Sequence, residues 1–117
     1  FLSKNKDVII PGPQKNIAKY VKNSFCGIAN LSIATGVQVK VLTYMSFGLP
    51  VICSKQVAIN FDKSTIVYKS DEDLINKIIE IKKKKAHWNK FSKKSISFIK
   101  KFKWKNISSR YFKLINL

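Results

Sequence analysis

The chain has 117 residues, enough for one domain or for part of one. Apolar residues make up 45% and aromatic residues 12%, a composition that excludes a largely disordered protein. With 23 Lys and Arg against 6 Asp and Glu, the net charge is +17, which favours anionic partners such as phosphorylated substrates, anionic lipid surfaces or nucleic acid. Arg110 is the only arginine, so sequence-specific reading of nucleic acid, which relies on arginine's planar fork, is not expected. The codon bias of an AT-rich genome is an alternative explanation of the lysine excess.

Cys26 and Cys53 each lie in an apolar run without Cys-x-x-Cys spacing, so we expect two small buried side chains and neither a disulfide nor a metal site. This usage favours a reducing, cytoplasmic setting. No apolar run reaches the roughly 18–20 residues that a membrane span needs, and no signal peptide is visible. Any contact with a membrane is therefore expected at its surface. Because the chain begins with Phe1, we expect it to be part of a longer protein.

The first elements alternate between strand and helix patterns. Residues 7–10 (DVII) predict a short strand that ends at the Pro-Gly-Pro turn of residues 11–13. Residues 15–23 predict an amphipathic helix, and residues 25–31 (FCGIANL) predict a second strand. A longer helix is expected to open at Gly36, to end at Gly48 and to be blocked by Pro50.

The same alternation continues. Residues 50–53 (PVIC) and 65–68 (TIVY) predict two further strands, with a loop over residues 56–63 between them. Ser70 is a predicted N-cap, with Asp73 at the third helical position. The core face of that helix is expected to carry four aliphatic residues, Leu74, Ile75, Ile78 and Ile79.

From Ala86 onward the pattern is helical. One stripe is expected to carry Trp88, Phe91, Ser95, Phe98 and Phe102, and a second run is expected to carry Trp104, Ile107, Tyr111 and Leu114. Strands that alternate with helices indicate an α/β fold with a parallel sheet, and strands that are apolar throughout agree with burial on both faces. The four predicted strands are fewer than the six of a doubly wound sheet, so we expect the others upstream of Phe1.

The start of the Gly36 helix has the geometry of an anion site. Its free N–H groups and its positive dipole end would lie at the carboxyl edge of the sheet, where ligands of α/β proteins bind. Gly36 would let a phosphate approach the backbone, with Lys40 and Thr43 on the adjoining face of the helix. This geometry suits a diphosphate.

The amino-acid sequence of this region resembles that of a known family. Residues 40–46 (KVLTYMS) and 48–52 (GLPVI) are similar, in order and spacing, to the donor-site helix of the family 4, or group 1, glycosyltransferases, retaining enzymes of the GT-B fold. Five flanking pieces agree in the same register: residues 8–12, 16–21, 70–74, 102–104 and Tyr111. The resemblance implies a Rossmann-like nucleotide-sugar-binding domain, N-terminally incomplete, over residues 1–85, with helices of residues 86–117 packing on the same domain.

The resemblance also implies a donor site. Its residues would be Gly36, Val37, Gln38, Lys40 and Thr43, with Gly12 and Pro13 as a loop on the side of the base. The implied reaction is hexose transfer from a nucleotide-sugar to a glycan or lipid-linked acceptor in cell-surface polysaccharide synthesis, with no metal or other cofactor. The implied partners are the donor and the missing N-terminal domain. The lysine excess adds an anionic surface, at the inner face of the membrane, as a further expected partner.

The sequence departs from the family pattern at both glutamates of the donor site, where Thr35 and Thr43 stand instead. A threonine offers one neutral oxygen in place of a carboxylate, a loss of about 1.5–3 kcal/mol for a charge-assisted hydrogen bond. An altered donor, weak activity and a catalytically inactive interaction module all remain open. Purely structural roles are a further alternative: Thr35 as a helix N-cap and Thr43 bonded back to a helix carbonyl.

Two other features have plain explanations. His87, the only histidine, is expected at the solvated surface. The aromatic residues of the C-terminal helices are expected to dock these helices onto the sheet, with membrane insertion beside the lysines, or stacking on single-stranded nucleic acid, as alternatives. No RNA-binding signature is present, so nucleic acid is the least expected partner.

Overall fold

The computed structural model describes residues 5–34, 36–102 and 114. Its elements follow one another in the order α1 (Ala18–Val21), β1 (Gly27–Ala29), α2 (Val39–Ser46), β2 (Val51–Ser54), α3 (Lys55–Ala58), β3 (Ile66–Tyr68), α4 (Asp71–Lys83) and α5 (Lys85–Lys101). Within the described residues the three strands form one parallel sheet in the order β1-β2-β3. The α/β class and the parallel sheet with flanking helices are therefore confirmed.

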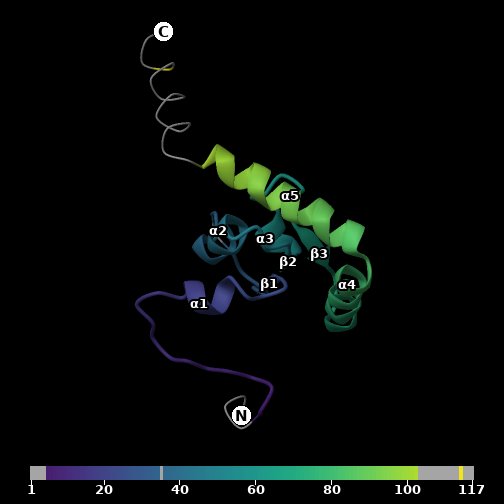
Figure 1. Ribbon diagram of the computed structural model, residues 1–117. Coiled ribbons are helices and arrows are strands. Elements are labelled where there is room, and N and C mark those ends of the chain that lie inside the picture. Colours follow the sequence, from purple (N-terminus) through teal and green to yellow (C-terminus); the bar gives the residue numbers. More distant parts are fainter. Residues whose placement is uncertain (1–4, 35, 103–113, 115–117) are drawn as a thin grey trace.

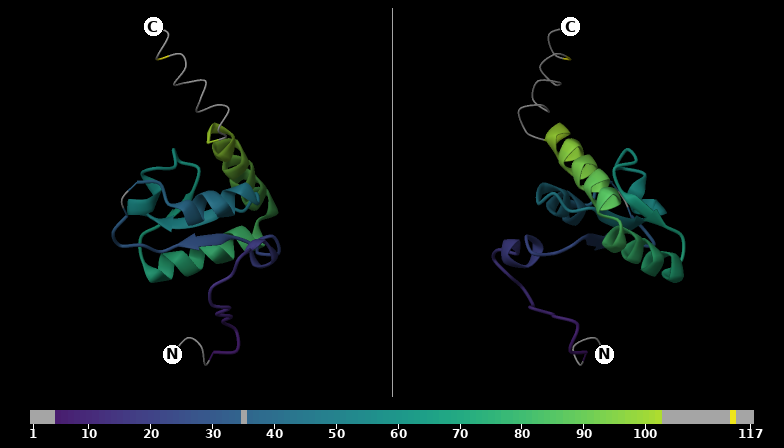
Figure 2. Two further views of the ribbon diagram at one scale, coloured as in Figure 1. Left: turned by 90° about the vertical axis from the view of Figure 1, so that its left-hand side faces the viewer. Right: turned by 45° about the vertical axis from the view of Figure 1, so that its right-hand side comes forward.

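The central strand β2 separates two apolar cores. Val51 and Cys53 pack into a cluster with α2, α3 and α5, whereas Ile52 packs into a second cluster with β3 and α4. All four residues of β2 are buried, as expected for a strand covered on both faces. Figure 2 shows the sheet lying between α2 and α4. Cys53 is buried as predicted, whereas Cys26 is only half-buried. Both are free thiols, and burial raises the pKa of each.

The connection from α2 to β2 follows the sequence closely. Gly48 adopts a left-handed conformation with φ of 72°, and its N–H donates to the Met45 carbonyl, so α2 ends where the glycine predicts. Ser92 Oγ and Ser95 Oγ of α5 donate to the carbonyls of Gly48 and Leu49 at 2.6 and 2.7 Å. These two bonds attach α5 to the turn that leads into β2.

The start of α4 is capped as predicted. Ser70 Oγ accepts a hydrogen bond from the Asp73 N–H at 3.1 Å, and Asp73 Oδ2 accepts one from the Lys69 N–H at 2.9 Å. The inward face of α4 differs from the prediction in part. Leu74, Ile78 and Ile81 face the core, while Ile75 and Ile79 lie further around the helix and are exposed.

The N-terminal segment corrects two predictions. Residues 7–10 form no strand: Ile9 is 77% exposed, and no described strand edge pairs with this run. The helix predicted over residues 15–23 is reduced to the single turn of α1, which buries only Val21. Figure 1 shows the preceding chain running away from the sheet. A β-branched run alone does not make a strand when no partner satisfies its backbone groups.

The structure corrects two further predictions. Gly36 does not open a helix, because it lies in a loop with φ of 68° and α2 begins three residues later, after Gln38. The predicted loop over residues 56–63 contains the short helix α3, whose Val57 is fully buried. In α5, Ser95 and Phe98 are buried as predicted, whereas Phe102, the residue that follows the helix, is exposed. The second helical run lies outside the described residues, apart from Leu114.

No helix in the described part of the chain is both long enough and apolar enough to span a bilayer.

We predict that Ser95→Ala destabilises the fold by about 1–3 kcal/mol, because it leaves the buried Leu49 carbonyl without its donor. The matched control is Ser97→Ala, the same change at an exposed position of the same helix, which should stay within about 0.5 kcal/mol of the parent. Urea unfolding followed by circular dichroism measures both. Equal effects of the two variants would contradict the role assigned to the Ser95 hydroxyl.

We also predict that Gly27→Ala destabilises the fold by about 1–3 kcal/mol, since the added Cβ would lie 2.2 Å from Tyr44 Cδ2 and 2.9 Å from Tyr44 Cβ. Strand β1 can approach α2 this closely only with glycine at this position. A double-mutant cycle with Tyr44→Ala, measured by urea unfolding, should show that the penalty is smaller when the ring is absent. Additive effects would mean that the contact does not cause the loss.

Candidate functional site

A cleft of about 710 Å³ lies at the carboxyl edge of the sheet. Because the strands are parallel, the segments that follow all three meet at this edge. The cleft is lined by Asn30, Leu31, Ser32, Ser54, Lys55, Gln56, Val67, Tyr68 and Lys69. Its size falls within the range of small-molecule sites, roughly 300–1,000 Å³.

The floor of the cleft is the last rung of the sheet, formed by Asn30, Ser54 and Tyr68. Ser54 pairs with Tyr68 in the strand register, and Asn30 directly follows Ala29, the partner of Cys53. The Tyr68 hydroxyl donates to Asn30 Oδ1, and Ser54 Oγ donates to the Leu31 carbonyl at 2.6 Å. These bonds fix three polar groups across the three strands.

The environment of Tyr68 keeps its hydroxyl protonated. Burial raises the pKa of this phenol, and the negative charges of Asp71 and of the ionised form of Cys53 raise it further. A neutral hydroxyl at this position can donate to Asn30 and still accept from a ligand.

The rim of the cleft is basic. Lys55 begins α3 and Lys69 follows β3, and both side chains are exposed. None of the nine lining residues carries a carboxylate. Two ammonium groups beside a floor of hydroxyl and amide groups suit an anionic, polyhydroxylated ligand. Among the described residues, no three His, Cys, Asp or Glu side chains come close enough to hold a metal ion.

The predicted donor residues lie beside the cleft on the loop and helix that follow β1. The Gly36 carbonyl accepts a hydrogen bond from Asn60 Nδ2 at 2.8 Å, which ties this loop to the segment after α3. Val37 and Lys40 are exposed, and Gln38 is the N-cap residue of α2 without a side-chain cap. The backbone ladder of α2 begins with the Val41 N–H bonded to the Gln38 carbonyl.

Thr43 was predicted either to contact the donor or to bond back to a carbonyl of its own helix, and the structure shows the second arrangement. Its Oγ1 donates to the Val39 carbonyl at 3.0 Å, one turn back along α2. The hydroxyl proton is therefore used within the helix, and only the oxygen lone pairs remain for a ligand. Thr35 lies outside the described residues. Gly12 and Pro13 are exposed in the segment before α1 and are not among the lining residues of the cleft.

Sequence reasoning missed the residues of the cleft itself. Asn30, Ser54 and Lys69 each lie at or just beyond the end of a strand, so the rule that ligands bind at the carboxyl edge could have selected them. The Tyr68–Asn30 bond joins residues 38 positions apart, and no local pattern indicates it.

Comparison with known proteins agrees with this geometry. The family model described as glycosyl transferases group 1 matches residues 2–84, which is more than half of the chain. No curated protein and no solved structure matches it. The match covers the three strands, the cleft and the loop that leads into α2. The chain belongs to the group 1 glycosyltransferases.

Proposed function

We propose that the chain is the donor-binding domain of a glycosyltransferase, which holds a nucleotide-sugar in the cleft at the carboxyl edge of the sheet. The transferred hexose would pass to a glycan or lipid-linked acceptor in cell-surface polysaccharide synthesis. The observation that carries the proposal is an acid-free cleft with two lysines at this edge, in a chain of the group 1 family.

In this proposal the residues around the cleft have two roles, one toward the diphosphate and one toward the hydroxyl groups of the ligand. Lys55 and Lys69, together with the loop amides of residues 36–38 and the Lys40 ammonium, would lie near the diphosphate. The Asn30, Ser54 and Tyr68 floor would hydrogen-bond to the hydroxyl groups of the ligand. Hydrogen bonds to charged groups contribute about 1.5–3 kcal/mol each, so the lysines would dominate affinity.

The same charges would serve the transfer step. The bond between the anomeric carbon and the diphosphate oxygen breaks, a bond to the acceptor hydroxyl oxygen forms, and the acceptor proton is lost to a base or to solvent. Negative charge develops on the leaving nucleoside diphosphate, and pre-positioned ammonium groups stabilise it in the transition state. We propose that lysines supply this charge in place of a metal ion. The acceptor would be bound by a further domain of the same protein, on the cytoplasmic side.

A second candidate function is a catalytically inactive interaction module. It is favoured by one observation: the Thr43 hydroxyl is bonded back to its own helix and offers no carboxylate where the family pattern has a glutamate. The two functions differ in whether the chain has a donor site that binds a nucleotide and that a carboxylate at position 43 can strengthen.

Isothermal titration of the chain with UDP, GDP, ADP and CDP tests the leading proposal. We expect saturable binding of at least one of them, and Lys55→Gln with Lys69→Gln should weaken it at least about tenfold while leaving the affinity for the uncharged nucleoside unchanged. The charge-matched control is Lys15→Gln with Lys22→Gln, two exposed lysines near α1. If the chain binds none of these nucleotides, the proposal is wrong.

Thr43→Glu separates an impaired site from an inactive module. A carboxylate at this position would accept hydrogen bonds from the ribose hydroxyls, so donor affinity should rise about ten- to hundredfold. Thr43→Gln is the neutral control of the same shape and should give a smaller gain. Titration with the nucleotide that binds best measures all three proteins. Unchanged affinity in Thr43→Glu would favour the interaction module.

A further inference from the structure

Charge is distributed unevenly along the chain. All six acidic residues lie within residues 1–80, whereas residues 81–117 contain 12 lysines, Arg110 and no acid. This last third therefore carries +13 of the net charge of +17. A compositional bias toward lysine raises the basic content everywhere, but it does not explain why the acids are confined to one part of the chain.

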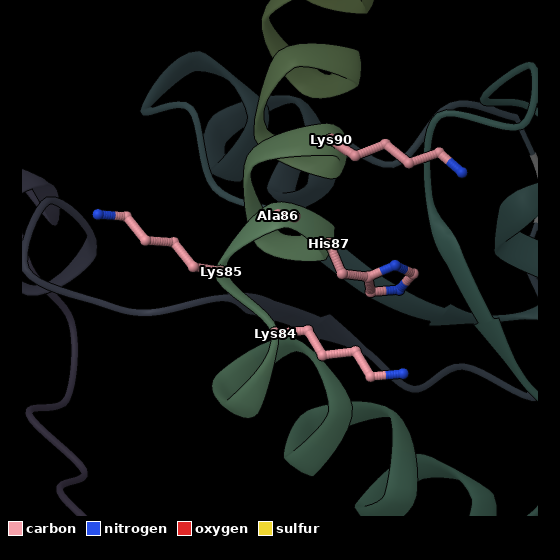
Figure 3. A pocket seen from close by; sticks show the side chains of 5 residues that line it. All are labelled: Lys84, Lys85, Ala86, His87 and Lys90. Atoms are coloured by element: carbon pink, nitrogen blue, oxygen red, sulfur yellow. The ribbon is translucent and has the colours of Figure 1, made fainter.

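Six of these lysines surround the junction between α4 and α5. We call Lys82, Lys83, Lys84, Lys85, Lys90 and Lys93 the junction patch, and all six are exposed. A shallow hollow of about 550 Å³ lies in its centre, lined by Lys84, Lys85, Ala86, His87 and Lys90. Figure 3 shows that the side chains of Lys84, His87 and Lys90 extend to the same side of the junction, while Lys85 extends to the other. The patch therefore presents cations over a broad surface.

Among the described residues, no acidic side chain forms an ion pair with a junction-patch lysine. Ion pairs in the described part of the chain join His87 to Glu80 at 3.8 Å and Lys101 to Asp62 at 3.6 Å, and none includes a junction-patch lysine. Lys82 and Lys83 suit the carboxyl end of α4, where cations are favourable. Lys85 lies in the first turn of α5, where acids are favoured, so helix stability does not account for it.

The junction patch lies at the opposite edge of the sheet from the cleft. Helix α4 begins directly after the carboxyl end of β3 and runs back across the sheet, so its end reaches the amino edge. The contacts of α5 place the junction at the same amino edge. Trp88 Nε1 donates to the Phe25 carbonyl at 2.8 Å, two residues before β1, and Ser92 Oγ donates to the Gly48 carbonyl ahead of β2. No residue lines both the cleft and the hollow of the patch.

We propose that the junction patch is a docking surface for an anionic lipid bilayer. Lysines act as diffuse point charges, which suit a fluid layer of headgroups. Ile75 and Ile79 are 57% and 43% exposed and lie in one row of α4 with Lys83, so apolar groups flank the charge as at a membrane interface. This inference goes beyond nucleotide binding, and docking in this orientation would leave the cleft open to water.

The aromatic residues of α5 argue for lipid and against nucleic acid. Trp88 is bonded to Phe25, Phe98 is buried, and Phe91 packs against the α4 core with Lys90 and Lys94 over its ring. Proteins that bind single strands use exposed rings on which bases stack. These three rings face the protein, so the patch offers charge without a stacking platform.

Flotation of the full chain with vesicles tests the proposal. The chain should bind vesicles of phosphatidylglycerol and phosphatidylcholine (about 30% anionic) and should not bind pure phosphatidylcholine, and added salt should weaken the binding. Each lysine near an anionic surface contributes about a fivefold increase in binding. Replacing Lys83, Lys84, Lys85 and Lys90 with glutamine should therefore weaken it by at least about 100-fold.

The control variant replaces Lys6, Lys15, Lys19 and Lys22 with glutamine, which gives the same net charge at exposed positions of the N-terminal segment and α1. It should change vesicle binding by less than about threefold. Equal losses in the two variants would overturn the proposal, as would binding of poly(U) RNA by the parent chain in the absence of vesicle binding.

Nucleotide titration keeps this test separate from the proposed function. The junction-patch variant should retain the nucleoside diphosphate affinity of the parent chain. A chain that binds vesicles and no nucleotide would overturn the proposed function alone, and one that binds nucleotide and no vesicles would overturn the docking surface alone.

Discussion

The parallel pairing of β2 with both of its neighbours is the constraint on which the other features depend. A parallel strand can be reached only by a crossover, so each connection must carry the chain back across a face of the sheet. In this chain α2 makes one return and packs with α5 on one face, while α4 leaves β3 and covers the other. The segments after the strands consequently gather at one edge, where they form the cleft, and the α4–α5 junction is placed at the other.

The attachment of α5 depends on the same arrangement. The carbonyls of Gly48 and Leu49 follow the end of α2, where the helix can no longer satisfy them, and a buried carbonyl without a donor costs about 1–3 kcal/mol. Ser92 and Ser95 supply hydroxyl donors from α5. Phe98 then joins the cluster of β2 and α2. Although the family match ends at residue 84, the helix that follows thus completes the core that the matched region begins.

The features predictable from sequence are those that local chemistry determines. Gly48 ends α2, and Ser70 with Asp73 begins α4, because each depends on groups within a few residues. The β-branched run of residues 7–10 failed as a strand because strand formation also requires a partner edge. The cleft could be predicted only in its location: its floor depends on the Tyr68–Asn30 bond between distant residues, whereas the predicted Thr43 turned to its own helix.

The two basic regions differ in what surrounds their charges, and this difference separates selective binding from diffuse attraction. At the cleft, Lys55 and Lys69 stand beside fixed hydroxyl and amide groups, so a ligand must match hydrogen-bonding geometry as well as charge. At the junction, six lysines on flexible stems adjoin His87 and exposed isoleucines but no fixed floor of hydroxyl and amide groups. Charge of this kind cannot select a particular small molecule, because each ammonium adapts independently. It does suit a surface that is itself fluid and uniformly negative, and the length of the strands separates that surface from the groups that would recognise a donor.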